Sequence, residues 1–196
     1  MQTFHITRIL AIACALVSQT GGCNAQQEPF GIKGWTIGQS SEVACRGAPT
    51  TNLQDIVRET GIKDIEVPVV SCVVNVDSIA GIAVAEPARL LFWRDGLTRV
   101  SMDLGWLELE ALAALRGTLL EAYGKPVTRR SDPFITDKWA KDSIQVELER
   151  TGKLPSNVGI YLTGNRGWAE YQRVKKLVDD RLDALKKLSR KRDLKE

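Results

Sequence analysis

The chemistry open to this chain is limited first by its near-complete lack of histidine. The sequence contains one histidine, His5, close to the N-terminus. The rest of the chain therefore has no Ser–His or Cys–His nucleophile pair and no histidine-based metal site. It also has no glycine-rich phosphate loop, no Ser-x-x-Lys segment after a strand and no Asp-x-Asp-x-Asp-Gly calcium loop. We predict no catalytic residue, no metal site and no cofactor, and we expect a non-enzymatic protein.

Pairs of carboxylates are the catalytic arrangement that the composition leaves open. Two acids that face each other across a cleft can hydrolyse a glycosidic bond. Acids solvated on an exposed face are the simpler interpretation, because the sequence alone shows no convergence. A carboxylate-dependent hydrolase with its site near Trp139 is kept as an alternative. The candidate acids are Glu147 and Glu149, on one face of a strand, and Asp132, Asp137 and Asp142, which surround Trp139.

The tryptophans could line a groove for a sugar or a peptide. Core packing is the favoured interpretation for most of them, since large aromatic side chains are mainly buried. We expect Trp35 to be the exposed one. The five are Trp35, Trp93, Trp106, Trp139 and Trp168.

Two cysteines of the chain body, Cys45 and Cys72, form an even pair. In an oxidising compartment such a pair predicts a disulfide. On the chain-entropy estimate, closing this loop stabilises the fold by roughly 3–4 kcal/mol. Two buried free thiols are the alternative, and a zinc site would need more ligands than this pair offers.

The first 25 residues resemble an export signal. Met1 to Arg8 carry one Arg and no acid, and a nine-residue apolar run, Ile9 to Val17, follows. This order predicts a signal peptide over residues 1–25, and no later stretch approaches the roughly 20 apolar residues of a membrane helix. We expect a periplasmic or secreted protein. Thr20-Gly21-Gly22-Cys23 is similar to a lipobox, so lipidation of Cys23 in an outer-membrane lipoprotein is the alternative.

The body, residues 26–164, alternates strands with short helices. Ala88 to Arg94 and Leu97 to Leu104 flank Asp95-Gly96, which predicts a two-residue hairpin turn pairing Trp93 with Thr98 and Leu91 with Val100. A helical period follows from Trp106 to Tyr123. Val67 to Val76 is expected to be a strand buried on both faces, and Thr50 or Thr51 is expected to cap a short helix.

These elements predict an α+β fold: an antiparallel sheet with helices packed on one face. A helix, a Gly-x-Pro stop and then antiparallel strands occur twice, so tandem α-β-β(-β) halves over 30–87 and 88–164 are a further expectation. Coincidence of common helix stops is the competing interpretation.

Residues 165–196 differ from the body in charge and pattern. Residues 166–196 contain eleven Lys and Arg against six acids, whereas residues 26–165 contain fifteen against eighteen. An amphipathic basic helix is predicted here. It can contact an anionic envelope surface or an unknown envelope protein, or it can end as a solvated helix; nucleic acid is not expected after export. The candidate partner contacts are Trp168, Tyr171, Arg190, Lys191 and Arg192.

The order of motifs near the start of the body is Gly38-x-Ser40, a short helix, Gly47-x-Pro49 and then strands. This order resembles the small exported envelope modules typified by the BamE (SmpA/OmlA) lipoproteins and the β-lactamase-inhibitor-protein fold. Tyr123-Gly124-Lys125-Pro126 repeats the same stop. The chain departs from that pattern in its shorter first helix, in Cys45 at an apolar packing position and in its long cationic helix. The resemblance implies a non-catalytic binding or assembly role and assigns no functional residue.

We therefore expect an exported, envelope-associated binding or assembly module of unknown partner. The alternatives are a carboxylate-dependent hydrolase of envelope polysaccharide and an inhibitor of a secreted enzyme.

Overall fold

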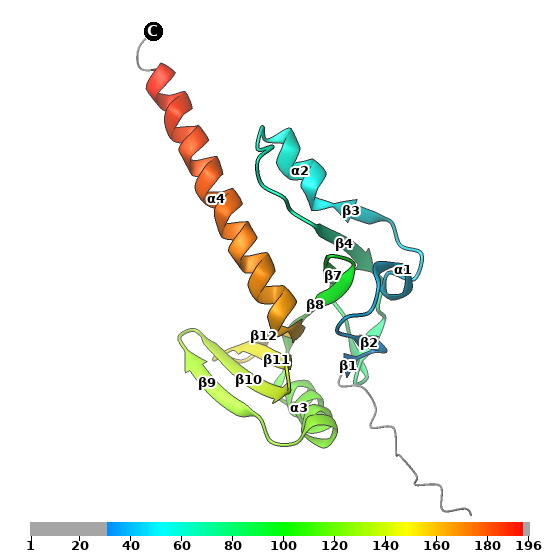
Figure 1. The fold of residues 1–196 in the computed structure, drawn as a ribbon. Helices are drawn as coiled ribbons and strands as arrows, with labels where there is room; N and C mark the ends of the chain where they lie inside the picture. Colours follow the sequence, from blue (N-terminus) through cyan, green and yellow to red (C-terminus); the bar gives the residue numbers. More distant parts are fainter. Residues whose placement is uncertain (1–30, 194–196) are drawn as a thin grey trace, which may run out of the picture.

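The computed structural model describes residues 31–193 of the chain (Figure 1). The predicted signal peptide over 1–25 and the candidate lipidation site Cys23 lie outside the described residues. Side chains are described up to residue 190, so those of Lys191 and Arg192 lie outside as well.

One antiparallel sheet of eight strands forms the body, and the predicted α+β class with a C-terminal helix is confirmed. Two short hairpins flank the sheet: β1 (Gly31–Ile32) with β2 (Trp35–Thr36), and β5 (Ser78–Ile79) with β6 (Ile82–Ala83). The helices are α1 (Ser41–Ala44), α2 (Leu53–Glu59), α3 (Leu109–Tyr123) and α4 (Asn165–Asp193). The sheet order is β3 (Thr50–Asn52), β4 (Val69–Val74), β7 (Ala88–Trp93), β8 (Gly96–Leu107), β12 (Ser156–Gly164), β11 (Ile144–Thr151), β10 (Phe134–Lys141) and β9 (Val127–Ser131).

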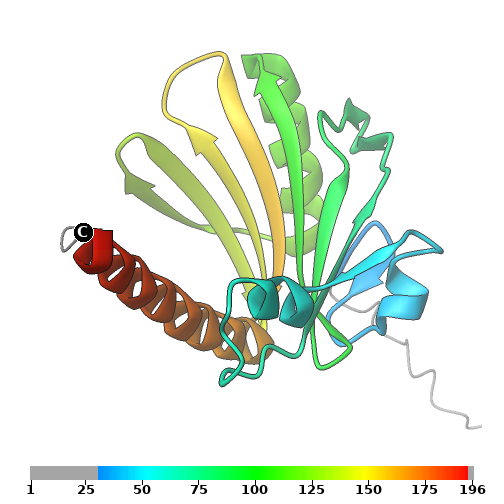
Figure 2. The ribbon, with the colours of Figure 1, turned by 90° about the horizontal axis from the view of Figure 1, so that it is seen from above.

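One side of this sheet, here called the closed face, packs against α3, which runs behind the fan of strands in Figure 2. Alternation along the strands places an apolar side chain on this face at every second position. Leu112, Leu115 and Leu119 of α3 are buried against it. The buried sheet residues include Val100, Met102, Val146, Leu148, Ile160 and Leu162.

The opposite side, here called the open face, carries the intervening polar residues of β8, β12 and β11. Two helices pack at its β4–β7 end. Val174 and Val178 of α4 join a second apolar cluster with Ile62 and Val69, and Leu91 and Trp93 pack against that cluster. The helices therefore lie on both faces of the sheet rather than on one. α4 follows β12 directly, so its apolar stripe meets the nearest uncovered apolar residues, which lie on β7.

The stretches 30–87 and 88–164 contribute to the same sheet. The second supplies six of the eight strands, and the first supplies β3 and β4. The main apolar cluster contains residues of both, including Cys45 and Cys72 from the first.

The hairpin register differs from the predicted one. The turn residues are Arg94 and Asp95, with φ of 49° and 65°, and Leu91 pairs with Arg99 rather than with Val100. The Asp95 carboxylate accepts hydrogen bonds from both the backbone N–H and the hydroxyl of Ser41, at the start of α1. This long-range contact holds Asp95 in the turn, and a bulge after Leu91 absorbs the shift.

The Cys45–Cys72 disulfide is confirmed, with Cα atoms 6.1 Å apart, and it ties the end of α1 to β4. Two local predictions are wrong. β4 is not buried on both faces, because Val73 points to solvent. The cap of α2 is Asn52, whose side chain accepts the Gln54 N–H, because the helix begins at Leu53, beyond the reach of Thr50 and Thr51 at the cap position.

Candidate functional site

Trp139 borders a cavity of about 270 Å³, but no acid lines that cavity. Trp139 is buried on the closed face and donates its indole N–H to the Gly124 carbonyl at 2.7 Å. Asp137, the nearest candidate acid, has no exposed surface. The prediction of a hydrolytic site near Trp139 is therefore wrong, because Asp137 is buried and the cavity that Trp139 borders has no carboxylate in its lining.

Asp137 is instead the centre of a buried ion network. Its carboxylate lies 2.6 Å from Nε of Arg116 on α3 and 3.6 Å from Nη2 of Arg150 on β11, and it accepts the Thr128 hydroxyl. Burial acts to raise the pKa of Asp137, but the hydrogen bonds from Arg116 and Thr128 and the two arginine charges outweigh it, so the pKa is lowered. A carboxylate held ionised in this way is unsuited to donate a proton.

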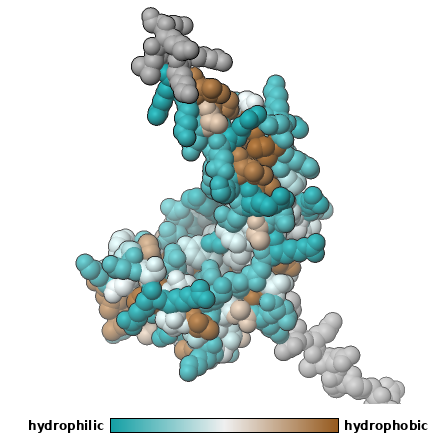
Figure 3. Space-filling view, turned by 60° about the vertical axis from the view of Figure 1, so that its left-hand side comes forward, coloured by the Kyte–Doolittle hydropathy of each residue, from teal (hydrophilic) through white to brown (hydrophobic). Residues whose placement is uncertain are grey.

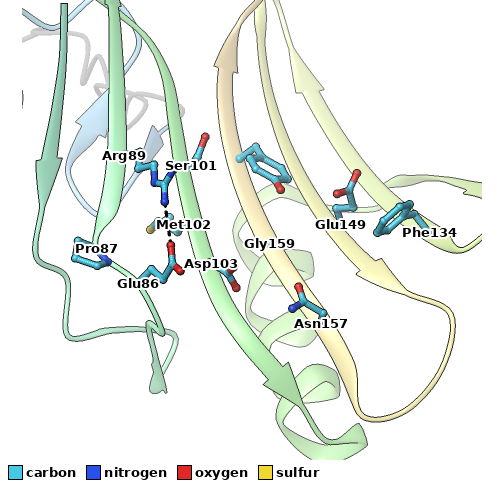
Figure 4. A pocket seen from close by; sticks show the side chains of 11 residues that line it. Glu86, Pro87, Arg89, Ser101, Met102, Asp103, Phe134, Glu149, Asn157 and Gly159 are labelled. Carbon is cyan, nitrogen blue, oxygen red and sulfur yellow. Dashed lines mark hydrogen bonds and ion pairs between the residues drawn. The ribbon is translucent and has the colours of Figure 1, made fainter. Parts of the chain in front are cut away.

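A cluster of solvent-facing polar side chains lies on the open face. They surround a groove of about 360 Å³ that spans β8, β12 and β11 and is closed at its sides by Glu86 and Phe134 (Figure 4). Two of its residues, Arg89 and Glu86, form an ion pair at 3.1 Å. Its other polar lining residues are Ser101, Asp103, Glu149, Asn157 and Tyr161.

Asp103 and Glu149 lie on either side of Gly159 in this groove (Figure 4). The register pairs Gly159 with Asp103 of β8 on one side and with Glu149 of β11 on the other. Because Gly159 has no side chain, the middle strand leaves a gap between the two acids. The phenol of Tyr161 fills the floor of that gap: a Cβ placed on Gly159 would meet its hydroxyl oxygen at 2.8 Å.

The Tyr161 ring is held from behind by Arg99. The Arg99 guanidinium lies 4.5 Å from the ring centroid of Tyr161 and 4.3 Å from that of Trp168, so it is stacked between a sheet residue and the first turns of α4. Arg99 also donates to the hydroxyls of Ser101 and Thr163, at 3.2 and 3.3 Å. Burial, with a smaller contribution from the Glu149 charge, raises the pKa of the Tyr161 phenol. The ring is therefore fixed and neutral at the floor of the groove.

The candidate partner contacts Trp168 and Tyr171 lie at the base of α4. Their rings are 5.2 Å apart, and both side chains are half-buried between α4 and the body. Arg190 is at the far end of α4 and is exposed. The structure thus separates the aromatic candidates, which pack on the body, from the basic one, which does not.

Two further aromatic residues border the open face. Phe134 lines the groove and is 44% exposed, and Trp106, which pairs with Asn157 at the end of β8, is 67% exposed. Trp35 is 1% exposed, because its indole N–H donates to the Ala44 carbonyl inside the main cluster. The expectation that Trp35 is the exposed tryptophan is wrong, and Trp106 takes that place.

The far half of α4 projects beyond α2, and hydrophobic side chains surrounded by hydrophilic ones are visible on this arm (Figures 1 and 3). Leu182 is the last stripe residue packed on the α2 side, whereas Leu185 and Leu188 are exposed among Lys186, Lys187 and Arg190. In the part of the chain that the structure describes, no helix is long and apolar enough to cross a membrane. Within the same residues no group of three or more potential metal ligands occurs.

The sequence prediction included Glu149 but missed Asp103, Asn157, Gly159 and Tyr161 as site residues. The pattern contained part of the information, because Val158, Ile160 and Leu162 predict a strand whose other face carries Asn157, Gly159 and Tyr161. Which strands lie beside that face depends on the sheet order, and local sequence does not encode it.

Comparison of the chain with models of protein families, with curated proteins and with solved structures gives no match. The likeness to BamE-type modules therefore stays a prediction. The candidate site rests on its own geometry.

Proposed function

We propose that this protein is a non-catalytic, exported binding or assembly module of the bacterial envelope that engages its partner with the open face of its sheet. The observation that carries the proposal is the groove above Gly159, where side chains from β8, β12 and β11 face solvent with no helix over them. Recognition surfaces of this kind join rigid aromatic side chains to a few polar groups. Here Tyr161 and Phe134 supply the rings.

The charge of the groove indicates the class of partner. Asp103 and Glu149 form no ion pair with any described residue, whereas Glu86 is paired with Arg89. The groove therefore presents two acids without ion-pair partners, one on each side of the Tyr161 phenol, although the Asp103 carboxylate also accepts the Gly105 N–H at 2.7 Å. A protein segment with a Lys or Arg beside an apolar side chain matches this pattern.

A binding role is favoured over hydrolysis by the position of Tyr161. A glycosidase needs room between its two carboxylates for the sugar oxygen and for water. The Tyr161 phenol fills the floor between Asp103 and Glu149, and Arg99 holds it there.

Hydrolysis of envelope polysaccharide remains the second candidate, because Asp103 and Glu149 line one groove. They stand two strands apart, so their backbones are separated by roughly 9.5 Å. An inhibitor of a secreted enzyme would use the same surface as a binding module, with the enzyme as its partner.

Export is part of the proposal. The confirmed Cys45–Cys72 disulfide supports an oxidising compartment. If Cys23 carries lipid, Cys23→Ser moves the protein from the detergent phase to the aqueous phase on phase separation. Unchanged partitioning would mean that ordinary cleavage releases a periplasmic or secreted protein.

The binding proposal is tested by affinity capture from an envelope extract. Wild-type protein is compared with Asp103→Lys/Glu149→Lys, which reverses the groove charge, and with Glu110→Lys/Glu121→Lys on α3, on the far side of the sheet. We expect one partner to be retained by the wild type and by the α3 variant, and to be lost by the groove variant. Retention by all three would place binding elsewhere and contradict the proposal.

The hydrolase alternative needs a separate measurement. Purified protein is incubated with envelope polysaccharide, and release of reducing ends is followed for the wild type and for Asp103→Asn. Release that is abolished in Asp103→Asn would establish hydrolysis and reject the non-catalytic assignment. We expect no release from either protein.

A further inference from the structure

A second cavity lies on the other side of the sheet, between α3 and the β11–β12 turn. Its volume is about 300 Å³. Its walls are apolar on the α3 side, with Leu109, Leu112 and Ala113, and Leu154 of the turn faces them. Leu109 and Leu154 are more than half exposed, so the mouth of the cavity is apolar as well.

The polar part of this cavity is cationic. Arg116 and Arg150 both line it, and both are paired with a single acid, Asp137. Arg130, on β9, adds a third positive charge that acts on Arg150. The region therefore contains more guanidinium groups than carboxylates, in a place where the Arg150 side chain is only 14% exposed.

Arg150 also has an unsatisfied donor. Its Nε–H is buried and has no hydrogen-bond acceptor among the described residues. Buried donors of native proteins are nearly always paired, so this guanidinium is incompletely satisfied by the chain. A ligand in the cavity would meet the exposed part of the Arg150 side chain rather than the buried Nε–H. Burial and the charges of Arg116 and Arg130 lower the pKa of Arg150, while Asp137 opposes them. One carboxylate thus does not fully compensate this guanidinium.

We infer that this cavity binds a small amphiphilic anion, an alkyl chain that carries a carboxylate or phosphate head group. The head group lies against the guanidinium groups of Arg116 and Arg150 and compensates their excess charge. The chain lies along Leu112 and Ala113 and leaves between Leu109 and Leu154. The site goes beyond the proposed function and does not depend on it, because the groove is on the opposite face of the sheet.

The cavity requires both the anionic head group and the alkyl chain of the ligand. A neutral alkyl chain would leave the excess guanidinium charge uncompensated, and an inorganic anion would leave the exposed leucines in water. In natural settings the same chemistry is found in free fatty acids and in anionic lipids. The probes below separate the carboxylate from the phosphate head group.

The experiment is an NMR titration of the ¹⁵N-labelled full-length mature protein with monomeric octanoate and octyl phosphate. Acetate and inorganic phosphate are the controls for the head group, and octanol is the control for the chain. We expect saturable shifts of amides in residues 109–116 and 150–154 with at least one amphiphile, with a dissociation constant of roughly 1 mM or tighter. The control compounds should bind about tenfold more weakly or not at all.

Two variants, Ala113→Trp and Leu154→Glu, locate the site without touching the ion network, and Ala114→Trp is their control. Ala113→Trp fills the cavity from α3, and Ala114→Trp places the same side chain one residue away, outside the lining. Leu154→Glu puts a negative charge at the mouth and affects only an exposed residue, so it serves if Ala113→Trp does not fold. We expect about tenfold weaker binding in Ala113→Trp and in Leu154→Glu, and wild-type binding in Ala114→Trp.

Three results would overturn the inference. The first is equal binding of inorganic phosphate and octyl phosphate, and likewise of acetate and octanoate, which would reduce the cavity to a simple anion site. The second is equal binding of octanol, which would make it an apolar cavity without a role for the arginines. The third is an absence of saturable shifts, or binding by Ala113→Trp and Leu154→Glu that equals the wild type.

Discussion

Tyr161 lies across Gly159, with its hydroxyl oxygen 2.8 Å and its ring carbon Cζ 3.1 Å from where a Cβ of residue 159 would stand. Only glycine lets the phenol lie at this height between Asp103 and Glu149. With any other residue at 159, Tyr161 would have to move into the groove. The pair thus defines the floor of the open face, and Arg99 stacked behind the ring keeps it in place.

Gly159→Ala is expected to displace Tyr161 and to destabilise the protein by about 1–3 kcal/mol, as overpacking does. The measurement is the free energy of unfolding from denaturant titration. In a Tyr161→Phe background the same substitution should be less destabilising by at least about 0.5 kcal/mol, because the closest contact is the hydroxyl. Equal losses in the two backgrounds would mean that the hydroxyl does not lie against residue 159.

Arg99→Met is expected to lower the free energy of unfolding by about 1–3 kcal/mol. It removes two ring contacts, each of about 0.5–1 kcal/mol, and hydrogen bonds from a largely buried group. A double-mutant cycle with Trp168→Leu should give a coupling energy of about 1 kcal/mol. The matched control is Arg89→Met: Arg89 is an exposed arginine paired with Glu86, and its loss should change stability by less than about 0.5 kcal/mol. A zero coupling energy would show that α4 is not held to the sheet through Arg99.

Asp137 should govern the acid stability of the fold. Its folded-state pKa is lowered, so the ionised form stabilises the folded protein above the unfolded-state pKa of about 3.9. That stabilisation is complete near neutral pH and is lost as the pH falls from about 4 through the lower folded-state value.

Asp137→Asn tests this directly. We expect a loss of roughly 3 kcal/mol at pH 7, because Arg116 and Arg150 keep their charges without a carboxylate. The difference in unfolding free energy between wild type and variant should shrink below about pH 4. A difference that stays constant down to pH 2 would show that Asp137 does not titrate with a lowered pKa.

The far end of α4 is expected to contact anionic surfaces without contributing to the stability of the body. Leu185→Ser/Leu188→Ser should change the free energy of unfolding by less than about 0.5 kcal/mol, since both residues are exposed. It should reduce co-sedimentation with phosphatidylglycerol vesicles, and added salt should weaken the wild-type interaction too. Val174→Ala changes a buried residue of the α4 stripe. It should lower the free energy of unfolding by about 2 kcal/mol and leave vesicle binding unchanged.

A truncation that tests the far end of α4 must leave the buried part of the helix in place. Removal of residues 166–196 would take Val174 and Val178 out of the second apolar cluster and would disturb the body. Removal of residues 184–196 leaves that cluster in place. Vesicle binding that survives the shorter truncation would contradict a role for the far end of α4.

The sequence was sufficient for the features that depend on local pattern. The α+β class, the C-terminal helix and the disulfide were all predicted, because apolar periodicity and an even cysteine pair encode them locally. The hairpin register was not, because the Ser41 contact that holds Asp95 in the turn is 54 residues away. Asp-Gly was the stronger local turn pattern, and the tertiary contact overrode it.

The candidate site was predicted only in part for a similar reason. The alternation in β11 placed Glu149 on an exposed face, and that is where it lies. Its neighbours Asp103 and Tyr161 come from β8 and β12, and their meeting depends on a strand order that sequence periodicity does not specify. The exposure of Trp106 was also missed. Its side chain was assigned to the following helix, but β8 continues to Leu107 and leaves the ring exposed on the open face.

The central claim is that the open face is the surface that meets a partner. The most direct measurement is site-specific photo-crosslinking in the cells that produce the protein, with benzoylphenylalanine in place of Asn157 in the groove or of Glu121 on α3. The account predicts a discrete crosslinked product from position 157 that is absent from position 121 and is lost when Asp103→Lys is added. A product from position 121 alone, or one from position 157 that is unaffected by Asp103→Lys, would contradict it.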